Sequence, residues 1–378
     1  MGARGMAERF SLKDHLFNAE SLGQLAAEFS VLPGFDAEGF VAETLSGFPE
    51  RELMERLEWM ADCLEPRLAP DFPTMADQLQ AALPPPLDPS RTDDDFGRFI
   101  HAVHGILIVR HGLEDHRDRA LDLLEEATQR FSMEFYIRPF LNRWPEETLA
   151  RMADWVAHGN YHVRRLVSEG TRPRLPWAKN VTIDPMAPLP FLDRLHADPT
   201  RYVTRSVCNH MNDLSRVDAH RVMDMIEGWH ADGRQDAKEL AWMTTHALRT
   251  LIKQGDARAM AILGYAAEAE VTVERLTMDP PAPKIGDRVV VEITLSAARE
   301  TPVLVDYAIG FLRPSGAVSD KVFKVKQGVV TPGKPLVLKK TQTFKGDATT
   351  YALVPGPHEL SLMVNGVVRA VLWFELRG

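Results

Sequence analysis

The pattern of apolar residues changes near residue 270, and this change constrains the fold more than any other feature of the chain. Before it, apolar residues recur at helical spacing, as in Leu121, Leu124 and Phe131. After it, short β-branched runs alternate with turns that contain Gly and Pro. The runs lie at 288–295, 302–312, 320–330, 336–344, 348–354, 358–364 and 367–376. This density of short strands predicts a β-sandwich. We therefore expect a helical domain at 1–270 and a sandwich at 271–378, joined by a proline-rich linker.

The helical part contains clear start and stop signals. Asn160 is placed to cap a helix that ends at Gly170. Asp198 is expected to cap a second helix, with Pro199 in its first turn, and Asp218 to cap a third.

These helices also repeat. The segments around Val163, Val203 and Met243 share helical patterning and lie at even intervals along the chain. A period of about 40 residues with two helices per unit predicts a HEAT-like α-solenoid, an architecture with a long surface suited to an extended ligand.

The net charge of −9 argues at first against a nucleic-acid partner, but the charge is unevenly distributed. Residues 271–378 hold 14 basic and 10 acidic side chains, a net charge of +4, whereas residues 1–270 carry −13. Seven lysines follow two neighbouring predicted strands and their connections: Lys321, Lys324, Lys326, Lys334, Lys339, Lys340 and Lys345. They are expected either to grip DNA or to form a solvated edge that prevents sheet-to-sheet aggregation.

A first candidate segment is FSMEFYIRPFLNRW, residues 131–144. Ser132 is expected to cap a helix, which would place Glu134 and Arg138 on one face, four residues apart. A surface ion pair is the simplest interpretation of this spacing. Pro139 implies a kink or an early end of the helix.

A second candidate is the loop TRPRLPW after Gly170, in which two prolines stiffen the chain. Arg172, Arg174 and Trp177 are expected to project from it, and such loops bind phosphates and bases. The alternative is that Trp177 packs between repeats and the arginines are only solvated. His158 and His162 are four apart, but a helix break intervenes and no third ligand stands at motif spacing, so no metal is expected.

A third candidate is Asp213 in CNHMNDLSR, near the C-terminal end of its predicted helix. The helix dipole disfavours an anion there, so the acid either has a function or caps the following turn. Nucleotide-hydrolase, α/β-hydrolase and zincin motifs are missing from the sequence. With two cysteines and no apolar run long enough to span a membrane, we expect a cytoplasmic protein, associated with the nucleoid if it binds DNA.

Together these segments resemble the AlkC-type DNA alkylation-repair glycosylases, a branch of the HEAT-like alkylpurine glycosylases. The matching stretches are SLKDHLFN at 11–18, PGFD at 33–36, EFYIRPF at 134–140, HVRRLVSEGTRPRLPW at 162–177 and NHMNDLSR at 209–216. The C-terminal sandwich is similar to the immunoglobulin-like domain of one subgroup of that family.

The resemblance implies a glycosylase that releases N3-methyladenine and N3-methylcytosine from duplex DNA without full base flipping. Because no Lys nucleophile is identifiable, we expect a monofunctional enzyme, and we expect it to be a monomer. The resemblance implies no metal or organic cofactor. The catalytic acids would be Glu134, Glu169 and Asp213. The residues expected to contact the lesion or the DNA are Trp177, Arg165, Arg172, Arg174, Arg138, Lys339 and Lys340.

Two other functions fit the same architecture. One is a DNA-lesion binding protein without enzymatic activity, and the other is a HEAT-type scaffold for protein partners. A scaffold has no need of an Arg-rich, proline-stiffened loop beside several acids, whereas a binding protein would retain affinity for methylated DNA without releasing a base.

Overall fold

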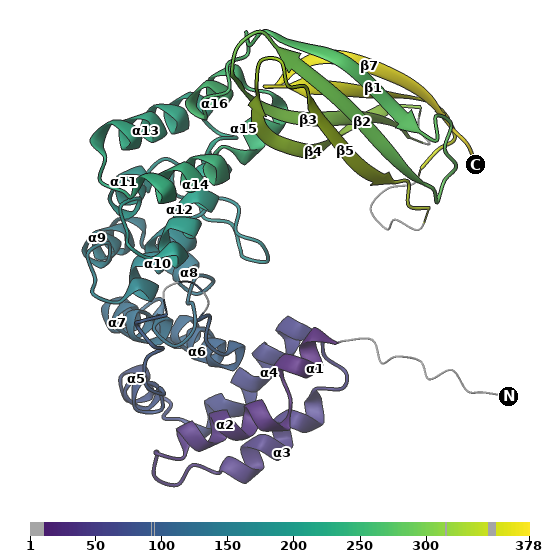
Figure 1. Cartoon of the computed structure of the whole chain (residues 1–378). Coiled ribbons are helices and arrows are strands. Elements are labelled where there is room, and N and C mark those ends of the chain that lie inside the picture. The colour runs from purple at the N-terminus through teal and green to yellow at the C-terminus, as the bar shows by residue number, and fades with distance from the viewer. Residues whose placement is uncertain (1–10, 92, 94, 314–315, 347–352) are drawn as a thin grey trace, which may run out of the picture. The chain divides into compact units, whose positions relative to one another are not determined.

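The computed structural model describes residues 11–91, 93, 95–313, 316–346 and 353–378. Helices precede strands along the chain, as Figure 1 shows. The helices are α1 (Leu12–Leu16), α2 (Ala19–Phe29), α3 (Ala37–Gly47), α4 (Leu53–Leu64), η1 (Glu65–Arg67), α5 (Phe72–Ala81), η2 (Phe99–His101), α6 (Ala102–Gly112), α7 (Arg117–Thr128), α8 (Ile137–Arg143), α9 (Pro145–Trp155), α10 (Tyr161–Gly170), α11 (Leu189–Leu195), α12 (Arg201–Leu214), α13 (Ala219–Asp232), α14 (Ala237–Ala247), α15 (Arg249–Gln254) and α16 (Ala257–Ile262). The strands are β1 (Val271–Asp279), β2 (Arg288–Ala297), β3 (Thr301–Leu312), β4 (Val318–Val330), β5 (Leu336–Thr343), β6 (Gly356–Val364) and β7 (Val367–Leu376).

The chain forms two compact units. The first comprises the residues up to 217 together with 232–243, and the second comprises 218–231 together with 244–378. The predicted order of a helical-repeat part followed by a β-sandwich is confirmed. The second unit contains helical residues in addition to the strands.

Helix α10 begins and ends where the sequence predicts. The Asn160 side chain accepts a hydrogen bond from the backbone N–H of His162 at 2.8 Å, which satisfies one of the unpaired amides of the first turn. Gly170 is the last residue of the helix, and its role is in packing. A Cβ at this position would lie 2.5 Å from Cγ2 of Ile137, so only glycine lets the helix end approach α8 this closely.

The predicted start of the next long helix is wrong by two residues. Helix α12 begins at Arg201 and its N-cap is Thr200. Asp198 lies before the cap, where it accepts hydrogen bonds from the backbone N–H of Thr200 at 2.9 Å and from Nε of Arg164 at 2.5 Å. Asp218 does cap α13, since its carboxylate accepts from the backbone N–H of Arg221 at 3.0 Å.

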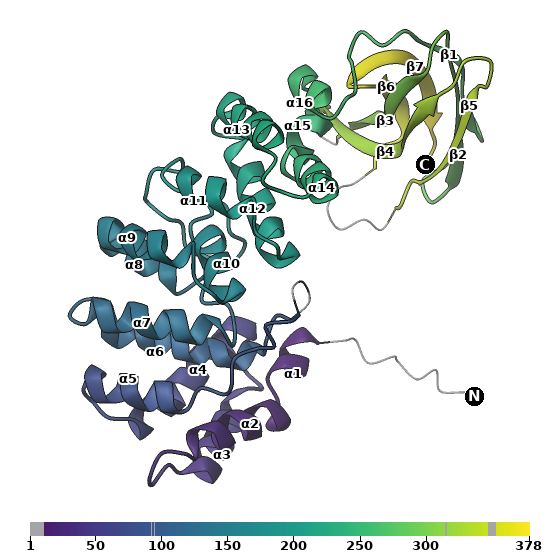
Figure 2. The same cartoon turned by 60° about the vertical axis from the view of Figure 1, so that its left-hand side comes forward.

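The predicted repeat of two helices per unit corresponds to every second helix of this part of the chain. Val163, Val203 and Met243 lie in α10, α12 and α14, and each side chain is fully buried. Helices α10 and α12 pack against each other, as do α6 and α7, which lie side by side in Figure 2. Burial of equivalent positions in successive repeats is expected of a solenoid, in which each repeat completes the core of its neighbour.

The helix predicted from Ser132 begins five residues later, at Ile137. Ser132 and Glu134 therefore precede the helix, and the predicted ion pair between Glu134 and Arg138 does not form. Pro139 lies in the first turn of α8, where backbone N–H groups have no partner within the helix. The proline is accommodated because the helix starts just before it.

The sandwich consists of two antiparallel sheets with strand orders β1-β2-β5 and β4-β3-β6-β7. Burial along β2 alternates with the period of two that a strand with one covered face requires. Its inward residues Val289, Val291 and Ile293 meet Val305 and Tyr307 of β3 in one core between the sheets. This interdigitation of two inner faces is the packing expected of a sandwich.

Six of the predicted strands correspond to β2–β7, but β1 was not predicted. It pairs with β2 along Val271–Asp279, although its charged residues interrupt the β-branched pattern that marks the other strands. The strand predicted at 348–354 falls largely on 347–352, which lie outside the described residues.

The lysine-rich strands β4 and β5 are not hydrogen-bonded neighbours. Each is an edge strand, and they belong to different sheets whose edges contact each other. Lys324, Lys326 and Lys339 are exposed. Within the described part of the chain, no helix combines the length and apolar character needed to cross a membrane.

Candidate active site

One face of α10 carries the first part of the candidate site. Arg165 and Glu169 are four residues apart, and Arg172 follows three residues later, just beyond the helix end. This spacing brings the three side chains to the same side of the helix. Arg172 donates from Nη1 to Oε1 of Glu169 at 2.6 Å, and Nη2 of Arg165 lies 3.8 Å from Oε2 of the same carboxylate.

The facing helix α12 supplies two more groups. Ser206 and Asp213 are seven residues apart, which is about two helical turns, so both face α10. The Ser206 hydroxyl donates to Oε2 of Glu169 at 2.6 Å, and Nε of Arg172 donates to Oδ2 of Asp213 at 2.9 Å. Asp213 is the penultimate residue of α12, where the helix dipole disfavours its charge, as the sequence indicated.

Glu134 enters the same cluster from the segment that precedes α8. Its Oε2 atom accepts from Nη1 of Arg165 at 2.8 Å and from the Ser132 hydroxyl at 2.7 Å. Arg165 also lies over the ring of Tyr202, 4.4 Å from its centroid. The structure thus brings together all three predicted acids, Glu134, Glu169 and Asp213, through the two guanidinium groups between them.

The site favours an ionised Glu169. Burial raises the pKa of this carboxyl, but Arg165, Arg172 and the Ser206 hydroxyl outweigh burial and hold the pKa below its usual value of 4.5. Burial alone would lower the pKa of Arg165. Glu134, Tyr202 and Glu169 raise this pKa by more than burial lowers it, so the guanidinium stays charged. Both changes stabilise a carboxylate–guanidinium cluster away from bulk water.

Each guanidinium binds two of the three carboxylates: Arg165 binds Glu134 and Glu169, and Arg172 binds Glu169 and Asp213. Side-chain exposure falls to 5% at Glu169 and 8% at Asp213, so charges in this cluster are weakly screened by solvent. Carboxylates held in such a setting can stabilise a positive charge that develops beside them.

Arg138 supports this site from behind. Its Nη1 donates to the carbonyls of Gly170 and Arg172 at 2.9 and 2.8 Å, and its Nε donates to the carbonyl of Lys179 at 2.6 Å. Burial is the main cause that lowers the pKa of Arg138 to about 10. The side chain of Arg138 is buried, so it does not form the contact with DNA that the sequence led us to expect. Its role is structural, because it anchors the loop after α10.

The residues of the loop after α10 fall into two groups, one buried and one exposed. Arg172 is buried and turns inward to the acids, so the prediction that it projects from the loop is wrong. Arg174 and Trp177 are exposed, and the Trp177 side chain is 77% accessible. Trp177 also adopts a left-handed backbone conformation with φ of 64°, which is rare for a bulky residue. The alternative that Trp177 packs between repeats is therefore wrong.

The histidines near the site are separately engaged. His210 lies with Nδ1 3.0 Å from the Ser168 carbonyl, and burial lowers its pKa to about 3. His158 accepts from the backbone N–H of Asn160 at 3.0 Å, whereas His162 packs on the Tyr161 ring. Among the described residues, no group of His, Cys, Asp and Glu is arranged to hold a metal ion.

Three site residues were not predicted from the sequence: Ser132, Ser206 and Tyr202. Nothing in the local sequence distinguishes a serine that binds a buried carboxylate from one that caps a turn. The seven-residue spacing from Ser206 to Asp213 was the available signal, because it places both residues on one face of α12.

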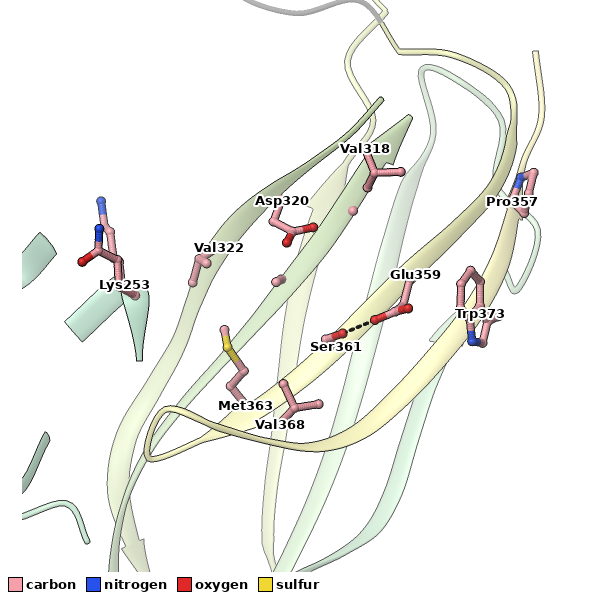
Figure 3. Close-up of a pocket in the computed structure, with 13 residues that line it drawn as sticks. Lys253, Val318, Asp320, Val322, Pro357, Glu359, Ser361, Met363, Val368 and Trp373 are labelled. Carbon is pink, nitrogen blue, oxygen red and sulfur yellow. Dashed lines mark hydrogen bonds between the residues drawn. The ribbon is translucent and has the colours of Figure 1, made fainter. Parts of the chain in front are cut away.

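The second unit has a hollow on the outer face of its four-stranded sheet, with a cavity volume of about 540 Å³ (Figure 3). Asp320 on β4, Glu359 on β6 and Trp373 on β7 line it, and the Ser361 hydroxyl donates to Glu359. The two carboxylates make this surface unsuitable for phosphate, so the lysine-rich edges remain the candidate DNA contacts of the sandwich.

Comparison with known proteins agrees with this architecture. Residues 272–378 match the family model described as the C-terminal Ig-like domain of the uncharacterised protein YhaZ. Over 370 residues the chain is 32% identical to the uncharacterized protein YhaZ of Bacillus subtilis (strain 168), covering 96% of this chain and 98% of that protein.

A solved structure extends the comparison to the whole fold. The Pseudomonas fluorescens alkylpurine DNA glycosylase AlkC, bound to DNA containing an abasic site analogue, superposes with a TM-score of 0.84 and 34% sequence identity. The match covers 98% of this chain and 100% of that one. The resemblance inferred from the sequence motifs is thus confirmed, and the chain belongs to the family of AlkC and YhaZ, in the subgroup with a C-terminal immunoglobulin-like domain.

Proposed function

We propose that this protein is a DNA glycosylase that hydrolyses the N-glycosidic bond of cationic alkylated bases, N3-methyladenine and N3-methylcytosine, in duplex DNA. The observation that carries the proposal is the cluster formed by Glu134, Glu169 and Asp213, together with the exposed Trp177 on the loop that follows α10. Membership of the AlkC family adds support, because the relative of known structure is an alkylpurine DNA glycosylase.

The chemistry requires little from the enzyme at the leaving group. Alkylation at N3 gives the base a positive charge, so its glycosidic bond is already weak. As the bond breaks, positive charge moves to the sugar, and carboxylates held in a water-poor site stabilise it. The three carboxylates share two tasks, which are to face the developing charge and to accept a proton from the attacking water.

Base release without strand cleavage is the expected outcome. Lyase chemistry needs an amine that attacks the sugar. The described groups in contact with Glu169 are guanidiniums and a hydroxyl, which remain poor nucleophiles at neutral pH.

Trp177 is proposed to contact the cationic base through its ring. Its exposure supports recognition at the protein surface, without full rotation of the base into an enclosed pocket. A 2-aminopurine placed next to the lesion tests this part of the proposal. Only a small rise in its fluorescence is expected when protein binds, whereas a large rise would indicate extensive unstacking.

We further propose that residues 1–270 form the glycosylase domain and that residues 271–378 contact DNA through the lysine-rich edges of β4 and β5. The exposure of Lys324, Lys326 and Lys339 supports the second part, whereas Lys340 is half-buried and Lys339 also forms an ion pair with Glu292 at 2.8 Å. The position of both strands at sheet edges also suits a role against aggregation, so the DNA contact needs its own test.

The test of activity is incubation of the protein with a methylated duplex, followed by detection of free base and of strand breaks. Free N3-methyladenine and N3-methylcytosine without strand cleavage are expected. Binding to the methylated duplex without base release would identify a lesion-binding protein, and absence of both would favour a protein scaffold.

A further inference from the structure

Phe96 is an exposed aromatic residue that lies close to the candidate active site. Its side chain is 52% exposed, although it belongs to a cluster of aromatic rings that is otherwise buried. The Phe96 ring meets the edge of Tyr202 at a centroid distance of 5.3 Å. Tyr202 in turn contacts Tyr161 and His162, with centroid distances of 6.0 and 5.5 Å.

This cluster is joined to the acids through one side chain. Arg165 lies over Tyr202 at 4.4 Å and binds Glu134 at 2.8 Å. Only the side chains of Tyr202 and Arg165 therefore lie between Phe96 and the carboxylate of Glu134.

The chain on either side of Phe96 is held in place. Gly97 pairs with Phe131, three residues before Glu134, and takes a φ of 71° that favours glycine. A Cβ at Gly97 would lie 1.9 Å from the carbonyl oxygen of Arg130, so this approach requires glycine. On the other side, Asp93 forms an ion pair with Arg205 of α12. Phe96 thus lies between two residues, Asp93 and Gly97, that contact other parts of the chain, and its ring packs against buried rings.

The surroundings of Phe96 offer an aromatic face rather than a net positive charge. Arg98 is exposed beside Phe96, whereas Arg91 and Arg205 form ion pairs with Asp95 and Asp93 of the same segment. Bases stack on exposed aromatic rings with little dependence on sequence, because every base has a π-face.

We propose that Phe96 is a DNA-positioning residue, which stacks on a nucleotide next to the damaged one and fixes the lesion over the acids. The proposal rests on the glycosylase function and adds a contact on a segment that the sequence motifs did not include. Phe96 contacts Tyr202 but none of the three acids, so it determines affinity and placement and leaves the bond-breaking groups unchanged.

The experiment compares Phe96→Ala, Phe96→Leu and Phe96→Tyr in the full chain, using a duplex that contains an abasic-site analogue for affinity and a methylated duplex for excision. Phe96→Ala and Phe96→Leu are expected to weaken binding and raise KM about tenfold, with kcat within about twofold of the unchanged protein and an unaltered salt dependence. Phe96→Tyr should retain DNA binding because tyrosine keeps the aromatic face.

Val31→Ala is the matched control, since Val31 is 60% exposed and its removal also takes an apolar side chain from the surface. Equal affinity of Phe96→Ala and the unchanged protein would overturn the proposal. Two further results would overturn it: normal DNA binding by Phe96→Leu, or losses of kcat and thermal stability without a loss of DNA binding. Each would mean that the Phe96 side chain serves only to pack against Tyr202. If the unchanged protein binds the abasic duplex in a Phe96-dependent manner but releases no base, the glycosylase function fails while the contact stands.

Discussion

Nε of Arg172 donates a hydrogen bond to Oδ2 of Asp213 at 2.9 Å, and this contact links the loop after α10 to the end of α12. The same guanidinium binds Glu169 through Nη1 at 2.6 Å. Arg172 therefore holds two candidate catalytic carboxylates in fixed positions.

Asp213→Asn is expected to reduce the single-turnover rate of base release at least tenfold, a loss of about 1.4 kcal/mol in transition-state stabilisation. The amide keeps the shape of the carboxylate and can still accept from Arg172, so the protein should fold. Asp62→Asn is a matched control, because Asp62 also lies near a helix C-terminus and pairs with an arginine, Arg110, at 2.8 Å. An unimpaired, folded Asp213→Asn protein would remove this residue from the mechanism.

Glu169→Gln should impair both excision and stability. Loss of the Glu169 carboxylate removes a negative partner from Arg165 and Arg172 in a buried site, and this should lower the free energy of unfolding by about 3 kcal/mol. Urea unfolding measures this cost. Glu134→Gln should slow excision as well, and the losses should combine non-additively with Asp213→Asn. Strict addition of the losses would mean that the acids act in separate sites.

The pH dependence of stability follows from the lowered pKa of Glu169. A carboxyl whose pKa is lower in the folded protein stabilises the fold above its unfolded pKa, near 4.5, and loses this effect as the pH falls through the folded value. The difference in unfolding free energy between the unchanged protein and Glu169→Gln should therefore be constant from neutral pH to about 5 and shrink below that. A difference that shrinks between pH 7 and 5 would contradict this assignment.

Arg174→Ala and Arg172→Ala should have different effects. Arg174 is exposed, so its removal should weaken binding to damaged and undamaged DNA alike and reduce the salt slope by about 1. Arg172 is buried, so its removal should lower the excision rate and the stability while the salt slope is unchanged. The measurement is binding to both duplexes over a series of salt concentrations. Equal salt slopes for Arg174→Ala and the unchanged protein would show that Arg174 contacts no phosphate.

Trp177→Ala is expected to lower excision about tenfold without reducing stability. A side chain that is 77% exposed contributes little packing, and the left-handed backbone at this position disfavours every residue except glycine. Trp177→Phe should retain part of the activity because it keeps an aromatic face. Thermal unfolding checks the stability, and a lowered Tm with normal excision would mean that the ring has a structural role.

The double substitution of Lys339 and Lys340 by Gln tests whether the sandwich contacts DNA. If both lysines bind phosphate, the salt slope should fall by about 1.8 and affinity at low salt should fall several-fold. Lys284→Gln is the control, because Lys284 is exposed on the sandwich outside the lysine-rich edges. These substitutions are preferable to truncation near Pro280, which would leave β1 without its partner β2. An unchanged slope would assign the lysines to protection of the sheet edges.

The parts of the fold that follow from local chemistry could be predicted. Asn160 as a helix cap and the alternating strands of the sandwich are examples, because each depends on neighbouring residues only. The start of α8 could not be derived from the Glu134–Arg138 spacing, since that spacing carries meaning only if the helix has already begun. Pro139 was the better signal, as a proline is tolerated in a first turn.

The acids of the site could be named from the sequence, but their partners could not. Arg165 binds Glu134 across 31 positions and Arg172 binds Asp213 across 41, distances along the chain at which local spacing carries no information. For the same reason Arg138 and Arg172 were expected at the surface, because an arginine that binds backbone carbonyls or buried acids looks no different in sequence from a solvated one.

Base release from a methylated duplex, measured in parallel for the unchanged protein and for Asp213→Asn, tests the central claim most directly. The unchanged protein is predicted to liberate N3-methyladenine and N3-methylcytosine and to leave intact strands with abasic sites, whereas Asp213→Asn should bind the same duplex and release base at least about ten times more slowly. Tight binding of the methylated duplex by the unchanged protein, with no free base above the spontaneous rate, would contradict the claim.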